Sequence, residues 1–273
     1  MKSDDKYLHG YSDTERNRLS DQADFLETMI YEFLDLSSCR RMLEVGCGTG
    51  GQSKILLSKY PLLAIDAVDI SETQIAQAKK EFDCLPNIKN RINFIVGDAH
   101  SLELKKASYD SIFIVWVLEH LKDPAVFLKS ISEYLQPGGK IYITEVYNNS
   151  LFVSPESPYQ MEYFKRYGDL QTKMGGDPIL GIKLGNLLFD AGFTEIKTRN
   201  LNRHYDKSNI YAKKRMFDYW KSLLLSAKDK LLAEKMVDEK FIELTLKEID
   251  LVKEDKDSIF YYCPIQAEAS KAL

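Results

Sequence analysis

The sequence predicts an α/β fold in which a largely parallel sheet is covered by helices on both faces. The first observation is that, from about residue 40 to 148, short apolar runs alternate with helical patterns. This alternation is typical of βαβ units, whose right-handed crossovers place helices on both sides of a sheet. The second is that several apolar runs end in glycine or an acidic residue, as strands do where they lead into ligand-binding turns. The architecture is therefore expected to be doubly wound.

Five apolar runs are the expected strands of this core, which we assign to residues 39–148. They cover residues 41–45, 63–69, 92–96, 111–115 and 140–144. The helices expected between them cover residues 53–60, 71–79 and 124–135. Ser71 is the expected N-cap of the second helix, and Gly138 with Gly139 is expected to break the third.

Three other regions lack this rhythm. Residues 1–38 carry apolar side chains at spacings of three and four, which predicts an N-terminal helical segment. Residues 149–180 are rich in Pro, Gly, Tyr and Phe, and residues 208–256 form a long helical stretch. We expect these last two regions to be insertions that together build a helical cap.

The core resumes after the first insertion and again after the second. Residues 181–207 are expected to continue it, with a strand over residues 193–200 that follows a helix ending at Gly192. Residues 257–273 are expected to form a C-terminal strand, over residues 258–263, and a tail. We expect the two strands to form an antiparallel pair at the edge of the sheet.

Composition and charge argue against several classes of function. The chain of 273 residues has 37 basic and 41 acidic side chains, and no basic stripe. Because affinity for nucleic acid comes largely from neutralised phosphates, no nucleic-acid partner is expected. No apolar run approaches the ~18 residues needed to span a bilayer, so no membrane partner is expected either. The oligomeric state stays open.

The four cysteines point away from a metal centre. They form no Cys-x-x-Cys pair and have no histidine partner at metal-ligand spacing, so no metal is expected. Unpaired cysteines are typical of a reducing compartment. The polar N-terminus also lacks the apolar stretch of a signal peptide. We therefore expect a cytoplasmic protein.

Ligand-binding residues are expected where the strands of the core end. The glycines of residues 46–51 permit a tight turn, and the free N–H groups of the following helix can face a polar group. Asp69 ends the second strand, and its carboxylate can accept hydrogen bonds from both hydroxyls of a ribose. Asp98 follows the third strand, where its carboxylate and the N–H of Ala99 can bind the edge of an adenine.

Taken singly, these features suit more than one cofactor. Gly46, Gly48 and Gly51 also satisfy the Gly-x-Gly-x-x-Gly spacing of dinucleotide-binding folds, and Asp69 lies 21 residues after Gly48. A nicotinamide-dependent oxidoreductase is therefore an alternative. It leaves the later motifs unexplained, and the sequence has no Ser-Tyr-x-x-x-Lys type of catalytic set.

Taken in series, the motifs resemble those of class I S-adenosylmethionine-dependent methyltransferases. Glu44-x-Gly46-x-Gly48-x-Gly50 resembles the acidic-x-Gly-x-Gly-x-Gly first motif of that family. Asp69, Asp98, the Leu-Glu-His segment at 118–120 and residues 135–140 match later motifs in order and spacing. The resemblance covers about residues 40–148. It implies a Rossmann-like sheet of seven strands, mostly parallel with one strand reversed.

The resemblance also implies where S-adenosyl-L-methionine would bind. The glycine turn would line its methionine end with Glu44 behind the amino group, Asp69 would hold the ribose, and Asp98 would bind the adenine. The N-terminal segment resembles that of a subgroup of small-molecule methyltransferases, of methyltransferase domain type 11 or 25, and would close over the cofactor. The implied cofactor residues are Tyr11, Arg18, Glu44, Gly46, Cys47, Gly48, Gly50, Asp69, Ile70, Gly97, Asp98, Ala99, Val115 and Trp116.

The methyl acceptor is expected to be a small molecule with an oxygen or nitrogen nucleophile. Methyl transfer from a sulfonium is an in-line displacement, so the protein mainly aligns the reacting atoms. His120 is the expected catalytic base; the alternative is that it only orders the loop on the substrate side. The aromatic residues of the two insertions would enclose the acceptor. The sequence also fits a non-catalytic protein that binds S-adenosylmethionine, or a protein methyltransferase.

Overall fold

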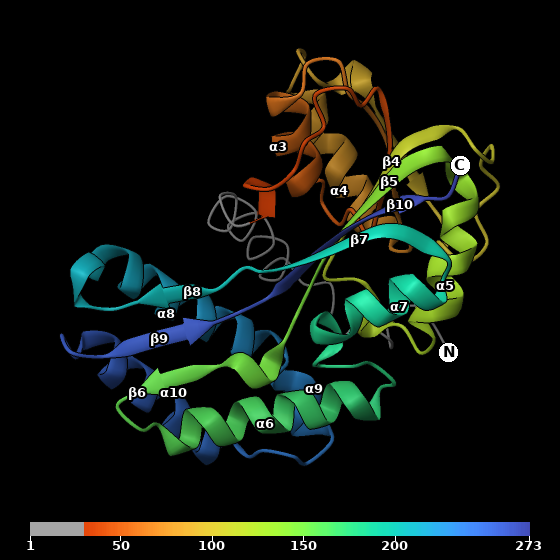
Figure 1. Ribbon diagram of the computed structural model, residues 1–273. Helices are drawn as coiled ribbons and strands as arrows, with labels where there is room; N and C mark the ends of the chain where they lie inside the picture. The colour runs from red at the N-terminus through yellow and green to blue at the C-terminus, as the bar shows by residue number, and fades with distance from the viewer. Residues whose placement is uncertain (1–29) are drawn as a thin grey trace.

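The computed structural model describes residues 30–273 and confirms the α/β architecture (Figure 1). Seven strands form one sheet in the order β3-β2-β1-β4-β5-β10-β7. They are β1 (Arg41–Val45), β2 (Ala64–Asp69), β3 (Ile92–Val96), β4 (Tyr109–Val115), β5 (Leu135–Glu145), β7 (Phe193–Asn200) and β10 (Ile265–Lys271). β10 is antiparallel to both β5 and β7, whereas the pairs among β1 to β5 are parallel. The expected reversed strand is therefore β10.

Helices cover both faces of this sheet, as expected for a doubly wound fold. α3 (Gly51–Lys59) and α4 (Glu72–Asp83) pack on one face, and α5 (Pro124–Ile131) and α7 (Leu184–Asp190) pack on the other (Figure 1). Met42 and Leu43, which are neighbours on β1, are both buried but belong to two different hydrophobic clusters. Successive side chains of a strand point to opposite faces, so a sheet covered on both faces requires continuous apolar runs.

Most of the elements expected between residues 41 and 145 are confirmed. Ser71 is the N-cap of α4, and its side chain accepts a hydrogen bond from the N–H of Gln74. The expected helix over residues 124–135 ends earlier, however, because α5 is followed by a 3-10 turn at Ser132–Tyr134 and β5 already begins at Leu135. Gly138 and Gly139 therefore lie within a strand and do not break a helix. They lie where the pairing of β4 with β5 shifts register.

The antiparallel pair expected between residues 193–200 and 258–263 is wrong in its second strand. The strand over residues 258–263 exists as β9 (Ile259–Tyr262), but it does not pair with β7. The partner of β7 is β10, which follows Pro264 and was expected to be a tail. Since proline cannot donate a backbone hydrogen bond, the chain leaves one sheet and enters the other at this residue.

β9 belongs to a second sheet of three strands, ordered β6-β9-β8. β6 (Phe152–Ser154) follows β5 along the chain, β8 (Arg203–Tyr205) follows β7, and β9 precedes β10. The strands of the small sheet, β6-β9-β8, therefore have the same order as the strands of the large sheet to which they are connected, β5-β10-β7. Figure 1 shows these strands running from the large sheet into the small one.

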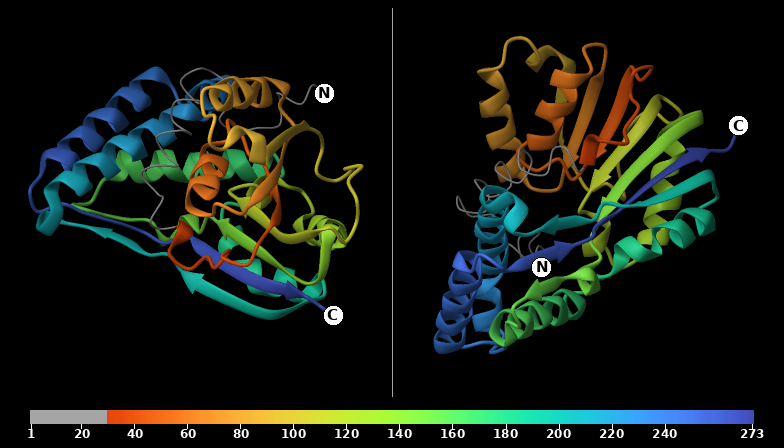
Figure 2. Two further views of the ribbon diagram at one scale, coloured as in Figure 1. Left: turned by 90° about the horizontal axis from the view of Figure 1, so that it is seen from above. Right: turned by 60° about the vertical axis from the view of Figure 1, so that its left-hand side comes forward.

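The helices of the two insertions pack around the small sheet and form the cap, the unit that Figure 2 shows beyond the end of the large sheet. The helices are α6 (Pro158–Lys173), α8 (Ile210–Ser226), α9 (Lys228–Ala233) and α10 (Glu239–Glu254). Their core contains Phe217, Trp220 and Phe260, which are fully buried and in edge-to-face contact. The long helical stretch expected over residues 208–256 is thus three helices, with breaks at Ala227 and over residues 234–238.

Short 3-10 turns complete the described part of the chain. They are η2 (Lys89–Arg91), η3 (Leu118–His120), η4 (Ser132–Tyr134), η5 (Asn148–Ser150), η6 (Leu180–Lys183) and η7 (Lys207–Asn209). Between residues 30 and 273, no helix has both the length and the apolar character needed to cross a bilayer.

Candidate functional site

Hydrogen bonds join the carboxyl ends of β1, β2 and β3 into one rim. The N–H groups of Gly46 and Cys47 donate to the carbonyl oxygen of Val68, at 2.8 and 3.1 Å. The N–H of Gly97 donates to the carbonyl oxygen of Asp69 at 3.0 Å. The strand order reverses direction between β1 and β4, and open α/β sheets bind ligands at such a switch point. The residues expected from strands one to three therefore lie at one edge of the sheet.

The turn after β1 requires its glycines. Gly46, Gly48 and Gly50 have φ angles of 72°, 54° and 82°, in the left-handed region that side chains disfavour. A Cβ atom on Gly46 would lie 2.3 Å from Cγ2 of Val117, and one on Gly50 would lie 2.9 Å from Cε2 of Phe82. The turn is thus held tightly between α4 and the segment that follows β4.

Two carboxylates lie against this turn. Glu44 is 2% exposed, and its Oε2 accepts a hydrogen bond from Oγ of Ser53 at 2.5 Å. Burial raises the pKa of Glu44 to about 7, and the nearby charge of Asp69 adds to the effect. A buried carboxyl with a pKa in this range is typical of a functional site, because a cationic ligand group would stabilise its charged form.

Asp69 ties the turn to the end of β2. Its Oδ2 accepts a hydrogen bond from the N–H of Gly48 at 2.8 Å, and its Oδ1 accepts one from the N–H of Ser71 at 2.9 Å. Burial raises the pKa of this carboxyl, against the opposing effect of the backbone hydrogen bonds. Asp69 therefore holds the glycine turn in place and still presents its carboxylate at the rim.

The remaining residues expected on this side differ in exposure. Asp98 is exposed after β3, and its Oδ1 accepts a hydrogen bond from the N–H of His100 at 2.9 Å. Ala99 is half-buried and Ile70 is exposed. Cys47 is buried, and burial raises the pKa of its thiol well above the usual value. Tyr11 and Arg18 lie outside the described residues.

The other side of the rim is formed by residues 116–120, which we call the post-β4 segment. Val115 ends β4, and Trp116 has a φ angle of 55°. The N–H of Trp116 donates to the carbonyl oxygen of Thr144 on β5, at 2.9 Å. A bulky residue in the left-handed region costs about 1–3 kcal/mol and persists only where its surroundings enforce it. Strained positions of this kind cluster at functional sites.

His120 ends the post-β4 segment beside a buried carboxyl. Its Nε2 lies 3.6 Å from Oε1 of Glu119, and Oε2 of Glu119 accepts a hydrogen bond from Nε2 of Gln171 at 3.0 Å. The His120 side chain is 18% exposed, and burial lowers its pKa to about 4. The imidazole is therefore neutral near pH 7, the form that can accept a proton. Gln171 comes from α6, so the cap reaches the post-β4 segment.

Three residues of this site were not expected from the sequence: Ser53, Glu145 and Gln171. Glu145 is the last residue of β5 and is fully buried. Burial and the neighbouring carboxyl of Glu119 raise the pKa of Glu145 well above its usual range, although three backbone hydrogen bonds oppose the shift. The rule that found Asp69 would have found Glu145 if the expected fifth strand had been extended by one residue.

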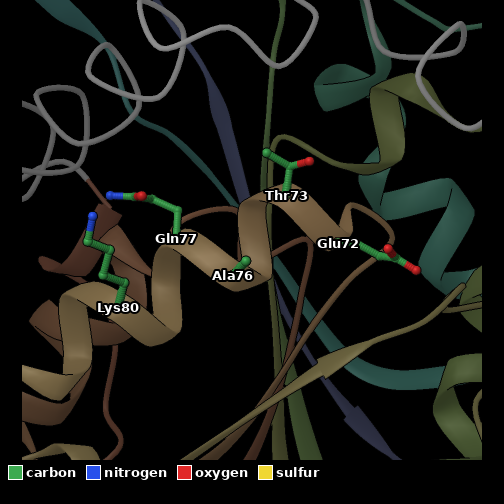
Figure 3. Close-up of a pocket in the computed structure, with 5 residues that line it drawn as sticks. All are labelled: Glu72, Thr73, Ala76, Gln77 and Lys80. Atoms are coloured by element: carbon green, nitrogen blue, oxygen red, sulfur yellow. The ribbon is translucent and has the colours of Figure 1, made fainter.

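An open hollow on α4 lies apart from these residues. Glu72, Thr73, Ala76, Gln77 and Lys80 line it, and Figure 3 shows their side chains spread along the helix. Gln77 is half-buried and the other four residues are exposed, so none of them is a buried polar group. An exposed helix surface without a buried polar group does not define a binding site. Within residues 30–273, no cluster of three or more His, Cys, Asp or Glu side chains could hold a metal ion.

Comparison with known proteins identifies the core. Residues 43–143 match the family model of a methyltransferase domain. Over 132 residues the chain is 32% identical to malonyl-acyl-carrier-protein O-methyltransferase 1 of Ilyobacter polytropus, covering 45% of this chain and 47% of that protein. The chain spans about half the length of the curated relatives that it matches.

Two solved structures share the fold. Phosphoethanolamine N-methyltransferase 2 of Haemonchus contortus, in complex with S-adenosyl-L-methionine, matches with a TM-score of 0.54 and 20% identity, over 93% of this chain and 53% of that one. The 4+2 cyclase SpnF matches with a TM-score of 0.55 and 19% identity, over 94% of this chain and 81% of that one. Because proteins of this fold are named for different reactions, the fold alone does not fix the activity. With the motif series at the rim and the matching family model, residues 43–143 are similar to a methyltransferase domain, and the described chain shares the fold of these two structures.

Proposed function

We propose that the chain is an enzyme that binds S-adenosyl-L-methionine at the carboxyl rim of its large sheet and transfers the methyl group to a small molecule. The observation that supports this most directly is the pair of carboxyls, Glu44 and Asp69, held against a left-handed glycine turn at the switch point. We propose that the acceptor has an oxygen or nitrogen nucleophile.

The residues of the rim fit the cofactor. The glycine turn leaves no room for a side chain at Gly46, so the backbone can approach a ligand closely. Glu44 has the raised pKa expected of a buried carboxyl that would gain from the cationic amino group of the methionine moiety. Asp69 holds its carboxylate where two ribose hydroxyls can donate, and the exposed Asp98 lies after the next strand, on the adenine side.

On the acceptor side, we propose that His120 lines the pocket as a neutral imidazole. When bound, the cofactor supplies a methyl group on a sulfonium, a good leaving group, so catalysis rests mainly on alignment. A neutral imidazole can accept the proton that a hydroxyl group loses as it attacks, or that a protonated amine must lose before it can attack. Its low pKa makes His120 a weaker base than an exposed histidine, which favours alignment with proton acceptance as a secondary role.

The cap supports an enclosed site for a small acceptor. Gln171 of α6 donates to Glu119, and the N–H of Asp177 donates to the carbonyl oxygen of Glu119 at 2.8 Å. The cap is thus fixed against the post-β4 segment, and a pocket between them would suit a small molecule better than an extended chain. We further propose a cytoplasmic setting, in keeping with the free thiols of Cys39, Cys47, Cys84 and Cys263.

Two measurements test the proposal. Calorimetry with S-adenosylhomocysteine should show binding, and NAD should show none. The purified protein is then incubated with methyl-labelled cofactor and a metabolite extract, and labelled products are identified by mass spectrometry. A labelled small molecule is expected. Cofactor binding without any labelled product would favour a non-catalytic binding protein, and label on protein would favour a protein methyltransferase. Absence of cofactor binding would refute the proposal.

A further inference from the structure

A single buried carboxylate holds the post-β4 segment. Glu145, the last residue of β5, accepts three backbone hydrogen bonds from this segment. Its Oε1 accepts from the N–H of Val117 at 2.9 Å and from the N–H of Leu118 at 2.7 Å, and its Oε2 lies 3.3 Å from the N–H of Glu119. Glu145 thus satisfies three successive N–H groups that open the 3-10 turn η3 and would otherwise lack an acceptor within the turn.

The segment that Glu145 holds lies between the two halves of the site. On one side, Val117 packs so closely on the glycine turn that no Cβ atom fits on Gly46. On the other side, the cap meets Glu119: a Cβ atom on Gly176 would lie 2.4 Å from the Glu119 carbonyl oxygen. A displacement of the segment would therefore change the glycine turn and the cap contact together.

The segment is also strained, which makes an anchor necessary. The left-handed conformation of Trp116 is unfavourable for a bulky side chain. The hydrogen bond from its N–H to Thr144 fixes one side of the residue, and the bonds from Val117 and Leu118 to Glu145 fix the other. Without the carboxylate, the residues after Trp116 are free to relax toward an ordinary conformation.

We propose that Glu145 is a positioning residue: its carboxylate holds the strained post-β4 segment so that Trp116 faces the cofactor and Val117 closes the glycine turn. This inference rests on the proposed function, because it assigns a task to that same site. Glu145 is fully buried, so it acts through the backbone of three neighbouring residues. Glu145 itself lies outside the motifs of the rim that the sequence revealed.

The test uses the fluorescence of Trp116 and the binding of S-adenosylhomocysteine. The chain has two tryptophans, and Trp220→Phe removes the one in the cap core, leaving Trp116 as the reporter. In this background Glu145→Gln preserves shape but replaces one acceptor oxygen with an NH2 group, which meets a backbone donor. We expect the dissociation constant to rise at least about tenfold, as for a buried backbone N–H left without its acceptor. The emission of Trp116 should also respond less to the ligand.

Glu268→Gln in the same background is the matched control. Glu268 is also a largely buried carboxylate on a strand of the large sheet, but it pairs with Lys140 and Arg199, away from the rim. This variant should lose stability and still bind the ligand within about twofold of the parent. If Glu145 had a purely structural role, Glu145→Gln would behave like this control: its stability would fall, and the folded protein would bind the ligand with unchanged affinity.

A second variant covers the case in which Glu145→Gln does not fold. Glu145→Asp keeps both acceptor oxygens but retracts the carboxyl group by one C–C bond, about 1.5 Å, and should weaken binding to an intermediate extent. If every Glu145 variant that folds binds within about twofold of the parent with the same Trp116 response, the inference is wrong. If the wild-type protein itself does not bind, the proposed function fails instead, so the two failures are distinguishable.

Discussion

Asp69→Asn is the most direct perturbation of the rim. The carboxylate accepts hydrogen bonds from the N–H groups of Gly48 and Ser71, at 2.8 and 2.9 Å. The amide keeps one acceptor oxygen and turns an NH2 group toward the other donor, so one charge-assisted bond is lost. Such a bond contributes about 1.5–3 kcal/mol. We expect affinity for S-adenosylhomocysteine to fall by about 1–3 kcal/mol, or roughly 5- to 150-fold.

Calorimetry at fixed pH and salt measures the affinity, and urea unfolding of the same samples measures stability. Asp66→Asn is the control: Asp66 lies on the same strand and accepts hydrogen bonds from Tyr109 and Asn93, but it is not at the rim. It should lower the unfolding free energy and leave the affinity unchanged. The reasoning is refuted if Asp69→Asn binds as tightly as the wild type, or if Asp66→Asn weakens binding to the same degree.

Three further predictions concern buried charges. Glu44 has a pKa raised to about 7, so the folded state binds more protons than the unfolded state between about pH 4.5 and 7, and stability falls as pH rises through that window. Glu44→Gln should therefore raise the unfolding free energy at pH 8 by at most about 3 kcal/mol and should not raise it at pH 4.5. Equal effects at the two pH values, measured by urea titration, would contradict this. His120 has a pKa lowered to about 4, so its contribution to stability is fully present above pH 6.5 and is lost as pH drops toward 4. His120→Asn should flatten the decline, and urea titrations from pH 7 to 4.5 that stay parallel to the wild type would exclude the assignment. Lys213 is buried and donates to the carbonyl oxygens of residues 255 and 256 at the end of α10. Lys213→Met should lower the free energy of unfolding by about 1–3 kcal/mol in urea titrations. Lys214→Met removes a half-buried lysine that pairs with Glu254 at the surface, and it should lower that free energy by less than about 0.5 kcal/mol. Similar losses would show that the two carbonyls do not need the cation.

The sequence was informative where local pattern and strand order determine position. The apolar runs placed β1 to β5 within a few residues, since a strand covered on both faces must be apolar throughout. Because the carboxyl ends of parallel strands share one edge, the same runs brought Glu44, Asp69 and Asp98 to one side of the sheet. The roles of these residues toward a cofactor stay predictions.

The sequence was less informative where tertiary pairing decides. β10 carries small and charged residues with weak strand propensity, and its strand conformation depends on pairing with β5 and β7. Gln171 and Glu119 are 52 residues apart and meet only because the cap folds back over the rim. No periodicity within either segment encodes that contact.

The three strands that cross from the large sheet into the small one determine how the cap can move. A lid that swings open needs a hinge of few backbone connections. Here β5, β7 and β10 are each joined to a strand of the cap sheet in the same order, β7 and β10 through short links and β5 through the 3-10 turn η5. Bending that junction would distort three adjacent chains at once. The cap is therefore expected to stay fixed relative to the large sheet, and in hydrogen exchange its strands should open together with that sheet, as one cooperative unit.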